Sequence, residues 1–313
     1  MPDLSFELPV SQPFRFQRCL EYMTRSPLEC LYEVDGDKVI RLIRAEGAAE
    51  SALLEISCPD DRALRVRFLQ GAPQSDAELS RIQSYIRDWF DLERDLAPWQ
   101  RLAEAGPVLG PLARSMYGLR LIGIPDLFEA LCWAIAGQQV NLAFAYKLKR
   151  RLTEAYGEAA DREGRTYRRF PDPAALAGAD PGELQALQLT KTKAAAIREV
   201  AALMQRGELS RAALLALGDF DAAERELVRV RGIGPWTAHY VRMRCLRDPR
   251  AFPIGDAGLH NAVKAQLGLD RKPTPQELQS LFAGWAGWEA YATFYLWHSL
   301  YELKTAALGK DNR

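Results

Sequence analysis

The chain has 313 residues, of which 48% are hydrophobic, and its 41 basic side chains balance its 41 acidic ones. A chain of this length buries a sizeable core and is expected to form two or three domains or one elaborate one. A net charge of zero excludes binding to nucleic acid through an overall basic excess, so any such binding must depend on local basic patches.

Targeting and metal-binding signals are weak throughout the sequence. No run reaches the roughly eighteen apolar residues of a membrane span, and the N-terminus lacks an apolar signal region. We therefore expect a cytoplasmic protein, nucleoid-associated or nuclear if the source is a eukaryote, with no membrane partner. His239 and His260 have no metal-ligand spacing with cysteine or carboxylate, so no zinc site is expected. The cysteines are widely spaced and form no C-x-x-C pair, which predicts reduced, structural thiols: Cys19, Cys30, Cys58, Cys132 and Cys245.

Residues 1–95 carry the signals of a small antiparallel sheet with helices. Asp35-Gly36 lies between stretches rich in Val, Ile and Leu, which is typical of a hairpin. Arg65 and Arg67 alternate with three apolar residues, so one face of that strand is predicted to be buried. The expected elements, in order, are a helix at 14–23, a hairpin at 31–46, strands at 53–58 and 64–69, and a helix at 75–90. We interpret this region as an accessory α+β domain.

Residues 96–313 read as an all-α bundle, because most of its segments begin with a helix cap and continue with apolar residues at helical spacing. The polar stretch 159–169 is predicted to be an exposed loop. The expected helices are a segment from the Asp126 cap to Gly137, one from the Asn141 cap to Tyr156, short helices after Asp172 and Asp180, and segments at 191–205, 221–230, 235–246, 259–267, 275–283 (with Thr274 and Glu277 as a capping box) and 288–303.

The most informative stretch is a predicted helix-hairpin-helix motif at 221–247. Asp221 with Glu224 has the spacing of a capping box, so a helix is expected to start there. Gly232 and Gly234 bracket one apolar residue, which allows a tight turn with outward N–H groups. A second helix then starts after this turn, since a proline at its first position needs no N–H.

The start of that second helix is a site for a phosphate oxygen, because its free N–H groups and its dipole both favour an anion. From Glu224 to Arg250, seven arginines against three acids give a local positive excess of four. The arginines are Arg225, Arg229, Arg231, Arg242, Arg244, Arg247 and Arg250. A second basic run comprises Lys147, Lys149, Arg150 and Arg151. A Gly turn by itself is also compatible with a simple connection between two helices.

The sequence VRGIGPWTAHYVRMR, followed by FPIGDAGL, resembles the helix-hairpin-helix (HhH-GPD) DNA glycosylase superfamily. The alkylation-repair branch, 3-methyladenine DNA glycosylase II, is the most similar. This resemblance implies a catalytic loop at 251–258. It implies base excision repair: a monomer binds double-stranded DNA containing damaged bases, flips alkylated purines of the 3-methyladenine or 7-methylguanine type, and removes them to leave an abasic site.

Asp256 is the expected catalytic residue. Cleavage of an N-glycosidic bond passes through a sugar with oxocarbenium character, which a nearby carboxylate stabilises, and the carboxylate can also orient water. The alternative is that Asp256 only caps the following helix, and the two roles are compatible.

The base pocket is expected to be aromatic, because alkylation at a ring nitrogen makes a purine cationic and π faces attract cations. By resemblance, Trp236, Tyr240 and Trp297 match pocket positions, and His298 stands where a relative has tyrosine. Tyr295 is a further pocket candidate, with core packing as an equal alternative.

The expected DNA contacts are Gln138, Gln139, Arg231, Gly232, Ile233, Gly234 and Thr237. By resemblance, Gln139 takes the position of the wedge that fills the gap left by the flipped base, although Gln138 remains an alternative. A glutamine pair that packs or caps between two helices is the simpler interpretation.

Two further expectations rest on the resemblance. Relatives that also cut the backbone use a lysine where this chain has Trp236, so no lyase activity is expected. Cys245 is the last cysteine, so the iron–sulfur cluster of some relatives is not expected. The family implies a structural Na⁺ or K⁺ at the carbonyls of Val228, Val230 and Ile233.

Two other classes of protein share part of this pattern. A non-catalytic helix-hairpin-helix DNA-binding protein would keep the turn and the arginines, but it has no need for Asp256 together with three pocket aromatics. A nucleotide-dependent enzyme would need a fuller phosphate motif, and no G-x-x-x-x-G-K-[ST] exists in the chain.

Overall fold

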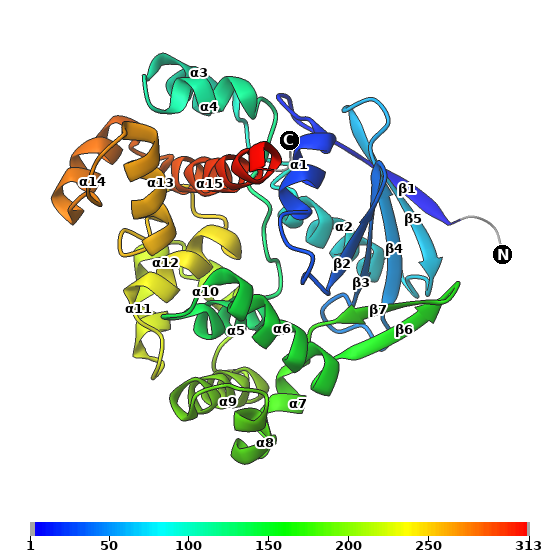
Figure 1. Ribbon diagram of the computed structural model, residues 1–313. Coiled ribbons are helices and arrows are strands. Elements are labelled where there is room, and N and C mark those ends of the chain that lie inside the picture. Colours follow the sequence, from blue (N-terminus) through cyan, green and yellow to red (C-terminus); the bar gives the residue numbers. More distant parts are fainter. Residues whose placement is uncertain (1–3, 312–313) are drawn as a thin grey trace.

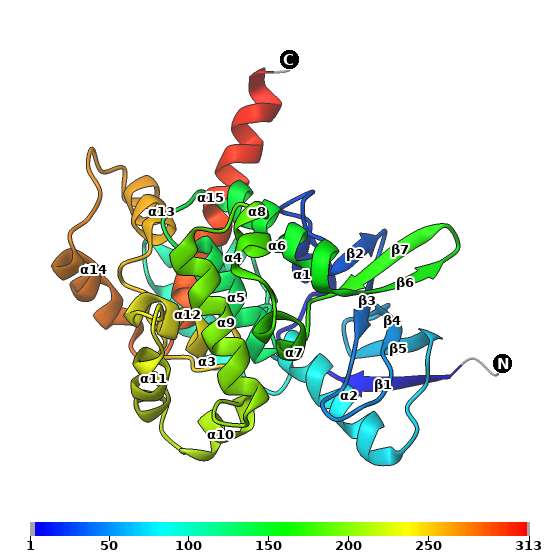
Figure 2. The same ribbon diagram turned by 90° about the horizontal axis from the view of Figure 1, so that it is seen from below.

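The computed structural model describes residues 4–311, with side chains described up to residue 303. An antiparallel sheet lies on one side of the molecule and a helical bundle on the other (Figure 1). The end of the last helix, α15 (Glu289–Asp311), extends past the body of the protein (Figure 2). Over the described residues, none of the helices combines the length and apolar character needed to span a bilayer. The α+β fold predicted from the sequence is confirmed.

The sheet has five strands in the order β1-β5-β4-β3-β2, and all neighbouring strands are antiparallel. Its strands are β1 (Ser5–Pro9), β2 (Tyr32–Asp35), β3 (Lys38–Ile43), β4 (Ala52–Ser57) and β5 (Ala63–Gln70). Gly36, with φ +64°, lies in the tight turn between β2 and β3. The sequence analysis missed β1, a short edge strand that ends at a proline, where the missing N–H costs no interior ladder bond.

One face of the sheet is covered by α1 (Phe16–Met23) and α2 (Asp76–Trp89). Leu64 and Val66 of β5 are completely buried on this face, whereas Arg65 between them is exposed, so the predicted alternation is confirmed.

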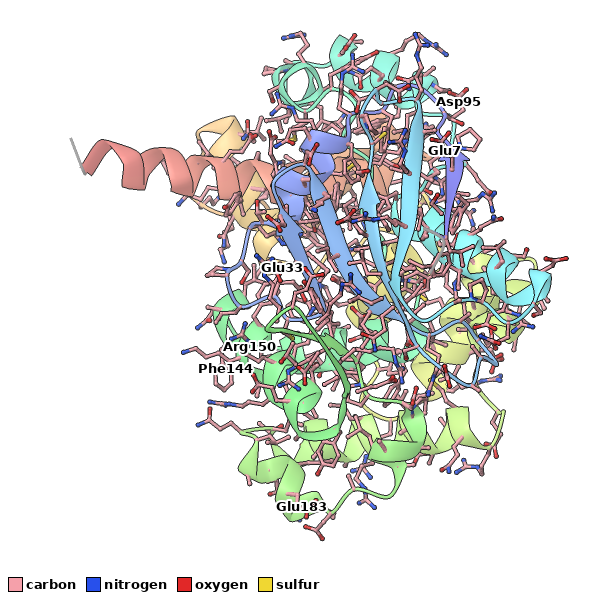
Figure 3. The ribbon with its side chains drawn as sticks, turned by 90° about the vertical axis from the view of Figure 1, so that its right-hand side faces the viewer. Glu7, Glu33, Asp95, Phe144, Arg150 and Glu183 are labelled. Atoms are coloured by element: carbon pink, nitrogen blue, oxygen red, sulfur yellow. The ribbon has the colours of Figure 1, made fainter. Side chains whose placement is uncertain are left out.

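The other face of the sheet carries a hairpin where we predicted an exposed loop, and that prediction is wrong. Strands β6 (Glu158–Arg162) and β7 (Arg165–Arg169) pair with each other, and Tyr167 packs on the sheet residues Ile40, Leu42 and Leu53. Both turn residues, Glu163 and Gly164, have positive φ, as a type I′ hairpin turn requires. The side view shows the hairpin beside the strands, near Glu33 (Figure 3). The sequence of this hairpin does not show the usual alternation of apolar and polar residues, because most of its residues are charged.

The remaining helices are α3 (Ala97–Ala105), α4 (Leu109–Ser115), α5 (Leu127–Gly137), α6 (Leu142–Tyr156), α7 (Pro173–Ala177), α8 (Pro181–Ala186), α9 (Lys191–Gln205), α10 (Arg211–Ala216), α11 (Phe220–Arg229), α12 (Pro235–Arg244), α13 (Ala257–Leu267) and α14 (Pro275–Phe282), with a short 3-10 turn at Ala283–Trp285. The predicted caps Asp126 and Asn141 accept N–H groups at the starts of α5 and α6. The predicted capping box of Thr274 and Glu277 is also present.

The predicted start of α11 needs correction. Asp219, and not Asp221, is its cap, because the Asp219 carboxylate accepts the N–H groups of Asp221 and Ala222. Asp221 lies in the first turn, where its side chain binds Arg242 of the next helix. Asp221, which the local pattern assigned to capping, therefore forms an ion pair with a residue of another helix instead.

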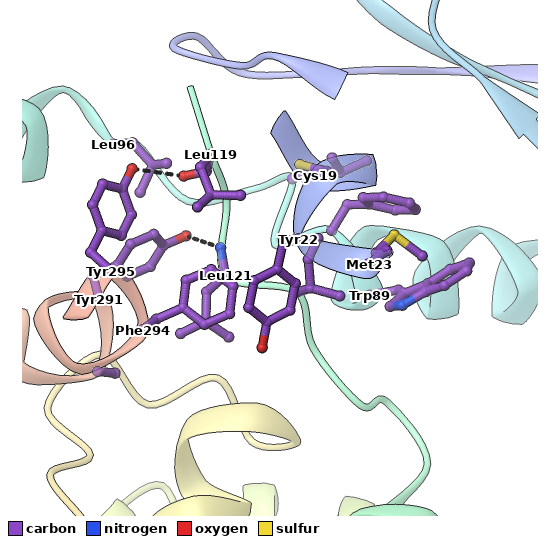
Figure 4. Close-up of a cluster of buried hydrophobic side chains, with 14 of the residues drawn as sticks. Cys19, Tyr22, Met23, Trp89, Leu96, Leu119, Leu121, Tyr291, Phe294 and Tyr295 are labelled. Carbon is purple, nitrogen blue, oxygen red and sulfur yellow. Dashed lines mark hydrogen bonds between the residues drawn. The ribbon is translucent and has the colours of Figure 1, made fainter. Parts of the chain in front are cut away.

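Helix α15 connects the bundle to the N-terminal part of the chain. Figure 4 shows Tyr291 and Tyr295 with the long connection that precedes α5, and Phe294 beside Tyr22 of α1. The Tyr295 hydroxyl donates to the Leu119 carbonyl at 2.9 Å. The two parts are also joined by buried charges: Arg41 on β3 binds Glu129 on α5 at 2.6 Å. All five cysteines are free thiols.

Candidate active site

Helices α11 and α12 form the predicted helix-hairpin-helix, and its tight turn is closed against α9. Gly232 has φ +94°, and a Cβ on it would lie 2.5 Å from the Ala196 Cβ, so only glycine fits. Pro235 occupies the first turn of α12, as predicted, and Arg231 and Gly232 are exposed. The turn therefore presents exposed backbone and the Arg231 guanidinium at the surface.

Two of the predicted DNA contacts lie inside the protein. Ile233 is 4% exposed, and its N–H donates to the Val230 carbonyl. Thr237 is 1% exposed, and its hydroxyl accepts a hydrogen bond from Gln138. The structure thus places both side chains behind the turn, and the contact of these two residues with DNA stays a prediction.

The local excess of arginine is also smaller at the surface than in the sequence. Arg242 and Arg244 are 3% and 5% exposed, and Arg247 pairs with Asp88 and Asp91. Lys149 of the second basic run is likewise buried against Glu29. The arginines that face solvent around the hairpin are Arg225, Arg229, Arg231 and Arg250.

Asp256 is half-buried at the start of α13, and its carboxylate accepts three N–H groups. The Leu259 N–H and the Trp297 indole both donate to Oδ1 at 2.7 Å, and the Trp236 indole donates to Oδ2 at 3.1 Å. Asp256 therefore caps α13 and is held between two indoles, and its catalytic role stays a prediction with which this geometry is compatible.

The loop that carries Asp256 is fixed by two histidines. His239 Nδ1 accepts the Phe252 N–H at 3.2 Å, and His260 contacts the Ile254 carbonyl through Nε2 and the Pro273 carbonyl through Nδ1, both at 2.9 Å. Burial lowers the pKa of His239, in keeping with its role as an acceptor. These contacts set the direction of the loop before the carboxylate.

Trp236, Tyr240 and Trp297 form a continuous aromatic group beside Asp256. The ring centroids are 5.7 Å apart for Trp236 and Tyr240 and 6.0 Å apart for Tyr240 and Trp297. Burial raises the pKa of Tyr240 to about 12, so the phenol stays neutral. Its hydroxyl accepts the Trp133 indole N–H at 2.6 Å.

The N-terminal part of the chain reaches this aromatic group through one guanidinium. Arg244 Nη1 donates to the Tyr240 hydroxyl at 3.0 Å and to the hydroxyl of Tyr22, on α1, at 3.3 Å. The guanidinium of Arg25 lies 3.8 Å from the centre of the Tyr22 ring, a cation–π contact. Residues from α1 and α12 therefore meet behind the aromatic group.

The two remaining pocket candidates lie elsewhere on α15. Tyr295 is fully buried against Trp99, so its expected place in the pocket is corrected to the core. His298 is 4% exposed and packs between Tyr22 and Tyr301. Burial, followed by the charges of nearby arginines, lowers the pKa of His298 to about 4, so this imidazole is neutral at physiological pH.

The loop between α5 and α6 lies against the hairpin turn. Gln138 Nε2 donates to the Gly232 carbonyl and to the Thr237 hydroxyl, both at 2.9 Å. Gln139 is exposed and has φ +54°, the left-handed region that few non-glycine residues adopt. Gln138 is therefore engaged with the turn, whereas the Gln139 side chain is exposed, and which of the two enters DNA stays a prediction.

Sequence analysis missed several residues that build this site. The spacing of four between Tyr240 and Arg244 places them on one helix face and was a usable signal. The sequence contains no such signal for Tyr22, Trp133 and Lys193, because they come from distant segments and each resembles an ordinary core or surface residue. Their roles depend on contacts across the fold.

Gly258→Ala is expected to lower the excision rate roughly 10- to 100-fold, as loss of a hydrogen bond to a charged group does. A Cβ at Gly258 would lie 2.9 Å from Asp256 Oδ1 and 3.5 Å from the Trp297 ring, so the carboxylate must turn. Single-turnover kinetics measure the loss. Gly284→Ala is the control, because its Cβ meets nothing within 4 Å; equal rates for the two variants would contradict this geometry.

The architecture and the site define a class of protein: a helical bundle that contains a helix-hairpin-helix and an aspartate loop beside aromatic side chains, preceded by a small antiparallel sheet. The family model of HhH-GPD superfamily base excision DNA repair proteins matches residues 132–287. That of the 8-oxoguanine DNA glycosylase N-terminal domain matches residues 3–131. Within the part of the chain described here, no group of three or more His, Cys, Asp or Glu side chains is arranged to hold a metal ion.

Named relatives narrow the class. The chain is 45% identical over 283 residues to a DNA-3-methyladenine glycosylase of Bacillus subtilis, covering 90% of this chain and 92% of the relative. It is 33% identical over 191 residues to Escherichia coli DNA-3-methyladenine glycosylase 2, covering 61% and 64%. The chain belongs to the HhH-GPD superfamily of base excision DNA repair proteins, in the branch of the 3-methyladenine glycosylases.

Solved structures show the same fold. The 3-methyladenine DNA-glycosylase of Archaeoglobus fulgidus superimposes with a TM-score of 0.78 at 19% identity, covering 93% of this chain and 97% of that one. An 8-oxoguanine glycosylase/lyase of Clostridium acetobutylicum in complex with double-stranded DNA gives 0.72 at 17% identity, covering 96% and 99%.

Proposed function

We propose that this protein is a DNA glycosylase of base excision repair that acts as a monomer on double-stranded DNA. It flips alkylated purines of the 3-methyladenine or 7-methylguanine type out of the helix and hydrolyses their N-glycosidic bonds. The observation that carries this proposal is the Asp256 carboxylate, held between the indoles of Trp236 and Trp297 and next to the hairpin. Relatives named for 3-methyladenine removal support the substrate class.

Asp256 acts on the sugar. As the bond to the base lengthens, the deoxyribose gains positive charge, and a carboxylate already fixed in position stabilises it without reorganisation. The indole and backbone donors supply that fixation, because each carboxylate oxygen has at least one N–H partner. The same carboxylate orients the water that completes hydrolysis.

The aromatic group of Trp236, Tyr240 and Trp297 receives the departing base. A purine alkylated on a ring nitrogen carries a positive charge, which the faces of these rings attract, and it leaves as a neutral base. Little acid catalysis is then needed. This agrees with the neutral state of Tyr240 and with the absence of any other carboxylate bonded to the three rings in residues 4–303.

DNA is held through the hairpin. The exposed turn at Gly232, with Gly234 at the start of α12, presents N–H groups and a helix dipole to a phosphate. Unstacking the flipped nucleotide costs a few kcal/mol. Gln139 fills the space that this nucleotide leaves in the duplex.

A monovalent cation at this turn follows from the family. The Val228 carbonyl lies in the last turn of α11, where carbonyls lack an intrahelical partner, and the Val230 carbonyl accepts only the Ile233 N–H among described backbone donors. Neutral carbonyl oxygens of this kind fit Na⁺ or K⁺, which would stiffen the turn and lie close to the bound phosphate.

The test is incubation with DNA methylated in bulk. We expect release of 3-methyladenine or 7-methylguanine with the strand left uncut, because an indole at position 236 cannot form the Schiff base of a lyase. Chromatography identifies the bases, and borohydride trapping detects any covalent adduct with DNA. Binding without base release would favour the alternative, a non-catalytic helix-hairpin-helix protein; a trapped adduct would contradict the monofunctional mechanism.

A further inference from the structure

Lys193 on α9 is buried and holds the end of α5. It is 8% exposed, and its Nζ donates to the Ala136 carbonyl at 2.8 Å and to the Gln138 carbonyl at 2.7 Å. The last carbonyls of a helix lack intrahelical partners and carry the negative end of the dipole, so a cation is favourable there. The ammonium therefore fixes the backbone at the point where α5 gives way to the loop that carries Gln139.

This lysine lacks a carboxylate partner among the residues described, and burial lowers its pKa. The other buried lysine, Lys149, is bound by both oxygens of Glu29 at 2.7 Å. Burying an amine is costly unless its donors are satisfied. The Lys193 ammonium instead donates its hydrogen bonds to two backbone carbonyls. This arrangement is expected of a group that positions a loop.

The same face of α9 also closes the hairpin. Ala196, three residues after Lys193, is the residue against which Gly232 packs. Gln138 completes the connection, because its backbone is bound by Lys193 and its side chain by Gly232 and Thr237. One helix thus holds both the phosphate-binding turn and the residue next to Gln139.

We propose that Lys193 is a positioning residue for base flipping: it holds Gln139 in its left-handed backbone conformation, at a fixed place relative to the hairpin turn. The proposal rests on the glycosylase function proposed above. A left-handed glutamine persists only where its surroundings enforce it. Without the ammonium, Gln139 relaxes and no longer supports the kinked duplex while the base is out.

The experiment compares two oligonucleotides that carry 7-methylguanine, either opposite cytosine or opposite an abasic analogue, where unpairing costs little. In single-turnover assays, Lys193→Met should lose roughly 10- to 100-fold on the paired duplex, the cost of a hydrogen bond from a charged group, and less than about threefold on the unpaired one. Lys191→Met, which removes an exposed lysine from the same helix, should behave as wild type on both.

Lys193→Gln keeps a donor without the charge, so it should fall between Lys193→Met and wild type on the paired duplex, and it serves if the methionine variant does not fold. Equal losses on the two substrates, or a wild-type rate for both variants on the paired duplex, would overturn the proposal. Wild-type protein that releases no base from either substrate would instead overturn the glycosylase function.

Discussion

Asp256→Asn is expected to reduce base excision by at least about 10³-fold while DNA affinity stays close to that of the wild type. The amide oxygen can still accept the Leu259 N–H, so the cap of α13 survives. The amide carries no negative charge for the sugar. Its oxygen takes the place of Oδ1 and also accepts the Trp297 indole, so its NH₂ faces the Trp236 indole, whose N–H it cannot accept. Single-turnover excision and a separate binding titration measure the two effects.

The control for Asp256→Asn is Asp270→Asn, which removes an equal charge from an exposed position beyond the end of α13. It should retain wild-type excision. Normal turnover by Asp256→Asn would remove this carboxylate from the mechanism, and loss of DNA binding by the same variant would show that it supports the interface rather than the chemistry.

Arg242→Met is expected to lower the free energy of unfolding by about 3–5 kcal/mol, the usual cost of leaving a buried charge without its partner. Arg242 donates to Asp248, which is completely buried, at 2.6 and 3.0 Å, and also binds Glu224 and Asp221 on α11. The substitution leaves the buried Asp248 carboxylate with only the Arg250 N–H at 2.9 Å and the Arg250 guanidinium at 3.6 Å, and it breaks the ion pairs that join the two helices of the hairpin. Urea unfolding followed by circular dichroism gives the change.

Arg229→Met is the matched control for Arg242→Met. Its side chain is 74% exposed and pairs with the half-exposed Glu226 on the same helix, an arrangement worth about 0–1 kcal/mol. Similar unfolding midpoints for the two variants would show that the buried network adds little to stability. Base excision should fall in Arg242→Met but not in Arg229→Met, because Arg242 holds together the two helices of the hairpin that presents the phosphate site.

Local chemistry made much of the fold predictable. The caps Asp126, Asn141 and Thr274 and the glycine turn at Gly232 act through neighbours in sequence, and the structure has them where the pattern placed them. Resemblance supplied Asp256, Trp236 and Trp297. The first error came from Asp221, where a local capping pattern competed with an ion pair to a residue twenty-one positions away.

The parts that could not be predicted depend on long-range contacts. Residues 158–169 fold as a hairpin because Tyr167 finds an apolar surface on the opposite sheet, and nothing in the charged stretch itself indicates that partner. Tyr295 shares the aromatic character of Trp297, but two residues along a helix point it to the other side, into the core. Residue type alone does not show which of the two lies in the core and which lies beside Asp256.

The bridge from Tyr22 through Arg244 to Tyr240 has a consequence for the modular use of this protein. The Tyr240 hydroxyl is linked through Arg244 to Tyr22 on α1. The region behind the aromatic group is therefore built from residues of both parts of the chain. Removing the first ninety-five residues to obtain a minimal enzyme would remove Tyr22 and leave the Arg244 guanidinium with the Ile122 carbonyl and the Tyr240 hydroxyl as its acceptors. The two parts are therefore best engineered as one unit, in which an exchanged domain must bring a tyrosine and an arginine that match across the contact.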